Sequence, residues 1–240
     1  MKRVLLGACV VMIAACSPAP APAPTPVAAK PAAVATPTPE TPAPAEEAEV
    51  AAPIAETWEL PGTLGPLTTR LELEARFGKD NVRQETFDGA EGIGTYPALV
   101  VYPDDPRKRL ELVLDGDNPD APIEQLRVSA PDSMWHDASG LRTGMTLAEL
   151  VKLNGAPVSF YGLGWDYGGT VQDWHGGKLA NPVGNRLFHG VNIVAREGAN
   201  EDKLPMGDTT FRSDDAKWPA IAKDLVVGQL AISWPHEGED

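Results

Sequence analysis

The chain has 240 residues and a formal net charge of −14, and its composition changes sharply along its length. All aromatic residues, six Trp, four Tyr and five Phe, lie beyond residue 55, so the first 55 residues have almost no side chains for a hydrophobic core. The remaining folding unit, about 185 residues, excludes a large multidomain enzyme. Formal charge is +2 over residues 1–16, −3 over 17–55 and −13 over 56–240, which argues against sequence-independent binding to nucleic acid.

The first sixteen residues have the pattern of a secretory signal. Positively charged Lys2 and Arg3 precede an apolar run of twelve residues, 4–15. A helix of that length rises about 18 Å, far less than the roughly 30 Å of the hydrocarbon core of a bilayer. The run is therefore too short for a stable membrane span, and residues 1–15 are predicted to be a signal peptide.

The end of this segment, Ile-Ala-Ala-Cys at residues 13–16, resembles the bacterial lipobox. The resemblance implies that Cys16 is acylated and becomes the first residue of the mature protein. Two or three acyl chains anchor a protein stably, whereas one holds it only reversibly. In the Gram-negative lipoproteins that this pattern resembles, a residue other than Asp after the cysteine goes with transport to the outer membrane. Ser17 therefore implies an outer-membrane lipid anchor, and a plain secretory signal with an incidental Cys16 is the alternative. We expect the folded part on the periplasmic face; exposure at the cell surface is the alternative to that.

Residues 16–55 are predicted to be the acylated cysteine followed by a disordered linker. Residues 17–55 contain eleven Pro and fourteen Ala, with no Gly and no aromatic residue. This composition is typical of chain with polyproline II character. At about 3.1 Å per residue its contour approaches ~120 Å, so it could hold the folded part well away from the membrane. We interpret the linker as a spacer; a passive solvating tail is the alternative.

Beyond residue 55, turn residues recur along the chain and short β-rich runs lie between them. Only two stretches, 68–77 and 146–153, have the apolar periodicity of a helix. Each begins with a threonine suited to capping a helix and is followed by a glycine, Gly78 or Gly155. Strands are predicted at residues 82–87, 98–102, 110–114, 123–128, 158–161, 170–174, 187–195 and 225–234.

The two predicted helices indicate an internal repeat. Thr69 and Thr146 each precede their glycine by nine positions, and four predicted strands follow each helix. The sequence therefore predicts an α+β fold of two tandem units, 56–136 and 137–240, each with one or two short helices packed on a four-stranded antiparallel sheet. Side by side, the units would form a long, partly concave sheet surface available to a partner. Chance agreement between ordinary helix-capping residues is the alternative.

Residues 144–146, Gly-Met-Thr, and residues 155–157, Gly-Ala-Pro, resemble the helical segment of small outer-membrane lipoproteins of the SmpA/OmlA type. The tandem arrangement resembles the β-lactamase-inhibitor-protein fold, which consists of two such units. The first helix shares only Thr69 and Gly78 with the pattern. The resemblance implies a non-catalytic binding scaffold in the cell envelope, and it does not imply inhibition of a β-lactamase.

Sequence motifs for enzymatic chemistry are absent. The chain has no phosphate-binding loop, dinucleotide fingerprint, His-Glu-x-x-His or Gly-x-Ser-x-Gly. Cys9 lies within the signal peptide and an acylated Cys16 has no thiol, so a cysteine nucleophile is excluded. We expect no catalytic residue, no metal and no cofactor. A glycan-binding or glycan-hydrolysing envelope protein remains the alternative, because two carboxylates facing each other across a cleft leave no local motif.

The segment 160–177 intersperses aromatic residues with glycines. One interpretation is a recognition loop, because Trp and Tyr side chains offer large contact areas at low entropic cost and a carboxylate can act as a polar anchor. The other is a twisted hairpin whose aromatic side chains fill the core. The expected partner is an envelope protein, with peptidoglycan as the alternative and no nucleic acid. The candidate recognition residues are Trp165, Asp166, Tyr167, Trp174 and His175.

Overall fold

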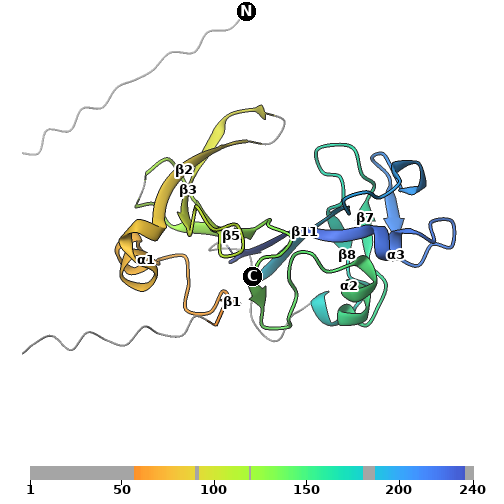
Figure 1. The fold of residues 1–240 in the computed structure, drawn as a ribbon, viewed down its shortest axis with the longest axis horizontal. Coiled ribbons are helices and arrows are strands. Elements are labelled where there is room, and N and C mark those ends of the chain that lie inside the picture. Colours follow the sequence, from red (N-terminus) through yellow and green to blue (C-terminus); the bar gives the residue numbers. More distant parts are fainter. Residues whose placement is uncertain (1–56, 90–91, 119, 181–186, 236–240) are drawn as a thin grey trace, which may run out of the picture. The chain divides into compact units, whose positions relative to one another are not determined.

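The computed structural model describes residues 57–89, 92–118, 120–180 and 187–235, so the predicted signal peptide, Cys16 and the linker lie outside the described residues. Figure 1 shows how the helices and strands are arranged. In chain order they are β1 (Glu59–Leu60), α1 (Arg70–Phe77), η1 (Lys79–Asn81), β2 (Val82–Asp88), β3 (Thr95–Val101), β4 (Leu110–Leu114), β5 (Ile123–Val128), β6 (His136–Asp137), α2 (Leu147–Asn154), β7 (Ser159–Tyr161), β8 (Val171–Asp173), η3 (Lys178–Ala180), β9 (Phe188–Ala195), η4 (Glu201–Lys203), β10 (Thr210–Arg212), α3 (Ile221–Asp224) and β11 (Leu225–Ser233). Within the described ranges, no helix has the length and apolar character needed to cross a bilayer.

Both predicted helices form, and their ends are capped as the sequence indicates. At α2, Thr146 is the N-cap: its hydroxyl accepts the N–H of Glu149 at 3.2 Å, and the Glu149 carboxylate accepts the N–H of Thr146 at 2.8 Å. Thr69 makes the same reciprocal capping box at α1. Gly155 follows α2 in the left-handed conformation, which costs glycine little. These local signals lie within single helical turns, which explains why the sequence predicts them.

The strands form mostly antiparallel sheets, so the predicted α+β class is confirmed. The largest sheet has six strands in the order β2-β3-β4-β5-β11-β9, and a three-stranded sheet has the order β10-β7-β8. A short parallel pair joins β1 to β6. All eight predicted strand regions contain an observed strand, and 110–114 and 123–128 match residue by residue.

The predicted division into two four-stranded sheets is not confirmed. β11 pairs with β5 along one edge and with β9 along the other, so strands from both predicted units share the six-stranded sheet (Figure 1). β11 has nine residues, and Leu225, Val227, Leu230 and Ile232 are fully buried along it. A buried strand needs partners on both edges to satisfy its N–H and C=O groups. β7 and β8 have three residues each, and β7 takes β10 as its second partner.

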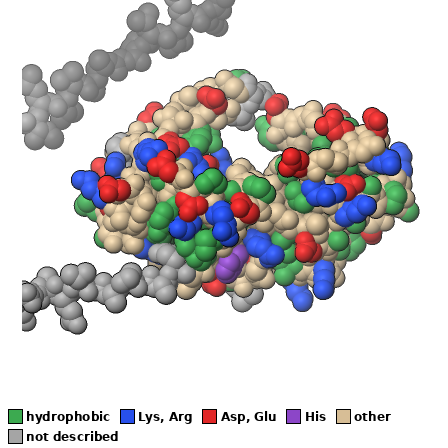
Figure 2. All heavy atoms as spheres, viewed as in Figure 1, with side chains coloured by type: hydrophobic (Ala, Val, Ile, Leu, Met, Phe, Trp, Pro, Cys, Tyr) green, Lys and Arg blue, Asp and Glu red, His purple; other side chains and the backbone are tan. Residues whose placement is uncertain are grey.

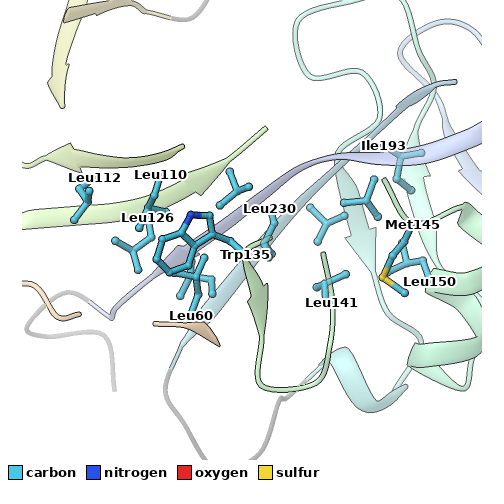
Figure 3. Packing of buried hydrophobic residues seen from close by; sticks show 14 of the residues in the cluster. Leu60, Leu110, Leu112, Leu126, Trp135, Leu141, Met145, Leu150, Ile193 and Leu230 are labelled. Carbon is cyan, nitrogen blue, oxygen red and sulfur yellow. The ribbon is translucent and has the colours of Figure 1, made fainter. Parts of the chain in front are cut away.

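One hydrophobic core joins residues from both predicted units. Trp135 is fully buried beside Leu60 and Leu126 (Figure 3), and its indole N–H donates to the carbonyl of Lys108 at 2.6 Å. The Trp135 ring also meets Trp58 edge to face, with centroids 5.0 Å apart. The same core continues to helix α2 and strand β9 through Leu141, Met145, Leu150 and Ile193 (Figure 3).

Candidate functional site

The aromatic loop, residues 162–170, connects β7 to β8 and contains three of the candidate recognition residues. Trp165 is half-buried, and its indole N–H donates to the carbonyl of Gly162 at 2.9 Å. Its ring meets Tyr161 and Tyr167 edge to face, at centroid distances of 5.3 and 5.4 Å. Tyr167 is 51% exposed, and Asp166 beside it is exposed. Trp165 therefore anchors the loop, whereas Tyr167 and Asp166 are available to a partner.

Main-chain hydrogen bonds fix the aromatic loop against neighbouring segments. Gly169 has a φ of +79°, and its carbonyl accepts the N–H of Ile193 at 2.8 Å. A Cβ at this position would lie 1.8 Å from the Ile193 carbonyl oxygen, so only glycine allows the approach. On the other side of the loop, the N–H of Leu163 donates to the carbonyl of Pro205 at 2.8 Å. The main chain of the loop is thus held in place by hydrogen bonds within the protein, which lowers the entropic cost of binding a partner there.

Exposed apolar side chains gather beside the aromatic loop. A shallow pocket of about 280 Å³ lies between the loop, β9 and the segment that precedes β10. Ile193 and Leu204 are its buried lining residues, whereas Val194 is 39% and Met206 49% exposed. We call this surface the Tyr167 patch; it consists of Leu163, Trp165, Tyr167, Val194 and Met206.

The other two candidate residues, Trp174 and His175, contact different parts of the structure. Trp174 is half-buried against the core, and its carbonyl accepts the side-chain N–H of the fully buried Asn154 at 2.9 Å. His175 has a φ of +49°, in the left-handed region that non-glycine residues rarely adopt. The structure therefore separates the five candidates: Trp165, Asp166 and Tyr167 lie on the aromatic loop, Trp174 packs against the core, and His175 belongs to a polar cluster.

His175 lies between a serine and an aspartate. Its Nε2 is 2.7 Å from the hydroxyl of Ser159, and its Nδ1 is 3.5 Å from a carboxylate oxygen of Asp173. The second Asp173 oxygen accepts the backbone N–H of His175 at 2.7 Å. A hydroxyl, an imidazole and a carboxylate in this order are the groups of a nucleophilic triad. Ser159 is only 5% exposed, which limits the access of any substrate to its hydroxyl.

Arg212 completes this cluster. Its guanidinium donates to both carboxylate oxygens of Asp214, at 2.9 and 3.0 Å, and Nη1 lies 3.5 Å from Nε2 of His175. The hydrogen bonds and charge of Asp214 raise the pKa of Arg212. In turn, the hydrogen bond from Arg212 lowers the pKa of Asp214. Both groups therefore carry their charges at neutral pH, and a solvent-exposed ion pair adjoins the imidazole.

Sequence reasoning missed Ser159 and Arg212. Strand pairing places Ser159 opposite Asp173 on β8 and opposite Arg212 on β10. Thirty-nine positions separate Asp173 from Arg212 in the chain, so no local pattern links them. Of the contacts in this cluster, only that between Asp173 and His175 joins residues close together in the sequence, two positions apart.

The six-stranded sheet carries an internally paired polar network on one face. Arg109 donates to Glu85 at 2.7 Å and to Glu111 at 3.3 Å. Arg127 lies over the ring of Tyr96, 5.2 Å from its centroid, and donates to its hydroxyl. In the view of Figure 2, acidic and basic side chains are likewise interspersed, without a large patch of one sign. Because these charges are paired within the protein, this face does not present a strong electrostatic potential of one sign to a partner.

Within the described part of the chain, no three His, Cys, Asp or Glu side chains converge as metal ligands would. Two features of the described residues could contact a partner or a substrate: the Tyr167 patch and the cluster around His175. No family model, curated protein or solved structure matches this chain.

Proposed function

We propose that this chain is an outer-membrane lipoprotein whose folded part binds a protein partner in the periplasm without catalysing a reaction. The charged start, the short apolar run and Cys16 support the lipid anchor. The Pro/Ala-rich residues 17–55 would hold the folded part away from the membrane. The anchor is argued from the sequence, because these residues lie outside the described ranges.

The exposed Tyr167 patch is the observation that carries the binding proposal. Met206 is 49% exposed and lines a pocket formed mainly by aliphatic side chains, and Tyr167, 51% exposed, lies on the loop whose Gly164 and Gly168 line the same pocket. Contiguous exposed apolar surface is uncommon on soluble proteins unless it contacts something. Tyr and Trp also dominate the energetics of many interfaces, because they bury large areas with few rotatable bonds.

The lining of the pocket favours a protein partner over a sugar. It is formed by Leu163, Ile193, Val194, Leu204 and Met206, together with glycines, Ala195 and the carboxylate of Glu201. A sugar needs several hydrogen-bonding groups to replace the water around its hydroxyls, since unpaired polar groups are costly to bury. An apolar side chain of a protein needs none. We therefore place peptidoglycan second among the partners.

In-cell crosslinking of the full-length chain tests this proposal. The wild type and a Tyr167→Ala/Met206→Ala variant would be crosslinked in parallel, and the captured species identified by mass spectrometry. Leu71→Ala is the matched control, because Leu71 is 77% exposed on α1 and belongs to no part of the patch. We expect one defined envelope protein in the wild type and the control, with recovery reduced about tenfold or more in the double variant.

Two outcomes would contradict the protein-binding proposal. Equal capture of the same protein by all three chains would remove the Tyr167 patch as the binding surface. Peptidoglycan fragments captured in place of protein would favour the glycan-binding alternative. Far-ultraviolet circular dichroism of the double variant would show that its fold is retained, because both substituted side chains are half exposed.

A hydrolase is the second candidate, favoured by one observation. Ser159, His175 and Asp173 lie in the order that activates a serine hydroxyl, with 2.7 Å between Ser159 Oγ and His175 Nε2. A fluorophosphonate probe reacts with activated serines and spares unactivated ones. Labelling of the wild-type chain that disappears in both Ser159→Ala and His175→Ala would establish this candidate in place of a non-catalytic role.

The two tandem units also remain part of the proposal. Matching capping boxes open α1 and α2, and the four predicted strand regions follow each helix in order, with the unpredicted β6 added after α1 and β10 after α2. In the six-stranded sheet, β2, β3, β4 and β5 form one antiparallel series, and β11 and β9 extend it. The bridge between Asn192 of β9 and Thr170, just before β8, then connects this sheet to the antiparallel pair of β8 and β7. This order supports two units that meet at the β5–β11 pair.

A further inference from the structure

The two edges of the six-stranded sheet differ. At the β9 edge, the aromatic loop supplies main-chain partners: the carbonyl of Gly169 accepts the N–H of Ile193 at 2.8 Å, and Thr170 bridges Asn192. At the opposite edge, β2 pairs with β3 and with no other described strand (Figure 1). An edge strand of seven residues is a template on which another strand can pair.

The register identifies which groups of β2 point outward. The N–H of Tyr102 donates to the carbonyl of Asn81, and the N–H of Gly89 donates to the carbonyl of Gly94. Hydrogen-bonded pairs alternate along an antiparallel ladder, and the β2–β3 register has no irregularity between these two bonds. The odd-numbered residues of β2 therefore bond to β3. The N–H and C=O groups of Val82, Gln84, Thr86 and Asp88 face away from it.

The side chains of β2 leave this edge accessible. Gln84, Thr86 and Asp88 are exposed, whereas Val82 is buried. Arg83 and Glu85 project from the opposite face, and their side chains are 53% and 25% exposed. Between Val82 and Thr86 the edge thus carries outward-facing main-chain groups and one residue of each charge, two positions apart, and these two residues also pair within the chain, Arg83 with Asp104 and Glu85 with Arg109.

We propose that β2 pairs antiparallel with β2 of a second copy of this chain, with Gln84 opposite Gln84 of the second copy. This register bonds the outward-facing groups of both strands and places Arg83 opposite Glu85 of the second copy, so that two charge-complementary pairs form across the two-fold axis. Centring the pair on Glu85 would bring two carboxylates together. Centring it on Thr86 would set Glu85 opposite Phe87 of the second copy. Charge complementarity therefore selects Gln84.

Strand geometry gives the number of hydrogen bonds and the Cα separations expected in this interface. Pairing of residues 82–86 in both copies forms about six main-chain hydrogen bonds and joins the two sheets into one. The area buried by two strand edges is small for a stable dimer, so the association is expected to be weak and concentration-dependent. Gln84 and its copy would have Cα atoms about 5.5 Å apart, whereas Thr86 and its copy would be about 13 Å apart along the strands.

Cysteine substitution on the full-length chain tests both the contact and its register. In a chain whose natural cysteines are replaced, Cys9→Ser/Cys16→Ser, the variants Gln84→Cys and Thr86→Cys would be oxidised mildly at matched concentrations. Disulfides require Cα separations of about 4.4–6.8 Å, so Gln84→Cys is expected to yield a covalent dimer and Thr86→Cys almost none. Dimer formation by Thr86→Cys alone, or by neither variant, would overturn the proposal.

Charge reversal provides an independent measurement. Arg83→Glu replaces both attractive pairs across the axis by repulsive ones, so the dimer dissociation constant from analytical ultracentrifugation should rise about tenfold or more. Arg83→Glu/Glu85→Arg exchanges the charges within each strand and should restore the dimer to within a few-fold of the wild type. Because Glu85 also accepts from Arg109 of its own chain at 2.7 Å, Glu85→Arg alone, with its urea unfolding, is the control for the loss of that contact. Asp104→Asn is the control for the ion pair that Arg83 makes within its own chain, and it should leave the dimer unchanged. A monomeric wild type, or a double variant no better than Arg83→Glu, would refute the pairing.

Discussion

Asp137 organises the turn that follows β6. One of its carboxylate oxygens accepts the N–H and the hydroxyl of Ser139, at 2.8 and 2.6 Å, and the N–H of Leu141 at 2.8 Å. The other oxygen lies 3.3 Å from Nε2 of His189, and both side chains are almost fully buried. Because β6 pairs with β1 and His189 belongs to β9, this carboxylate ties the first described strand to the main sheet.

The charge state of Asp137 should control part of the stability of the fold. Burial would raise the pKa of Asp137, but the hydrogen bonds from His189, Ser139 and Leu141 outweigh burial and lower the pKa. A folded-state pKa below the unfolded value of about 3.9 means that this carboxylate stabilises the fold above that pH. Its contribution is lost as the pH falls through the lower, folded-state value.

Asp137→Asn should therefore lower the free energy of unfolding by about 2–4 kcal/mol at pH 7. The difference from the wild type should be smaller at pH 3, which lies below the unfolded-state pKa of about 3.9, so that the carboxyl of the unfolded wild-type chain is protonated there. Urea unfolding at both pH values measures it. Asp166→Asn, on the exposed loop, is the control and should change stability by less than about 0.5 kcal/mol. Equal stability of Asp137→Asn and the wild type at pH 7 would show that the buried contacts contribute nothing.

At the scale of single elements, the capping boxes of α1 and α2 are expected to contribute measurably to the stability of the fold. The backbone N–H of Thr146 bonds to Glu149 and lowers the pKa of that carboxyl, and Thr69 does the same for Glu72. Helices α1 and α2 have eight residues each, so the first turn is a large part of each helix. Helices this short depend on their caps and on packing, because isolated helices of this length are not stable in water.

Thr146→Ala should cost about 1 kcal/mol in the free energy of unfolding, because it leaves the N–H of Glu149 without its side-chain acceptor. Thr146→Ser keeps the hydroxyl and should stay within a few tenths of the wild type. Thermal and urea unfolding of both variants give the comparison. A loss as large in the serine variant as in the alanine variant would mean that the threonine methyl group, and not the cap, is responsible.

The contrast between helices and sheets shows which features of this fold a sequence can predict. The helix ends depend on residues three to nine positions apart, such as Thr146, Glu149 and Gly155, and they form where predicted. Strand positions follow from local composition. Strand partners do not: β5 and β11 pair through Leu230 and Val128, and this contact depends on burial of the whole of β11. The His175 cluster escaped prediction for the same reason, since three strands assemble it.

At the scale of the whole molecule, the shared core couples the segments that the sequence divides into two units. β11, at the end of the described chain, lies between β5 and β9, and its buried residues join the same cluster as Trp135 and Leu150. The β5–β11 pair therefore joins the side of the sheet that carries the β2 edge to the side that carries the aromatic loop. A partner on the Tyr167 patch and a second copy on the β2 edge would contact opposite edges of one sheet, so the two contacts need not compete.

The proposed lipid anchor would decide where this sheet is presented, and it can be tested at two cysteines and one serine. Cys16→Ser should abolish incorporation of radiolabelled palmitate completely, since only the thiol can form the thioether to the lipid. Cys9→Ser is the matched control: it lies inside the apolar run and should leave labelling unchanged. Ser17→Asp should keep the label but move the protein from the outer to the inner membrane fraction, because the retention signal of the resembled lipoproteins is an aspartate at this position. Label retained by Cys16→Ser, or lost by Cys9→Ser, would contradict the proposed anchor, and the folded part would then have to reach any envelope partner without the lipid argued from Cys16.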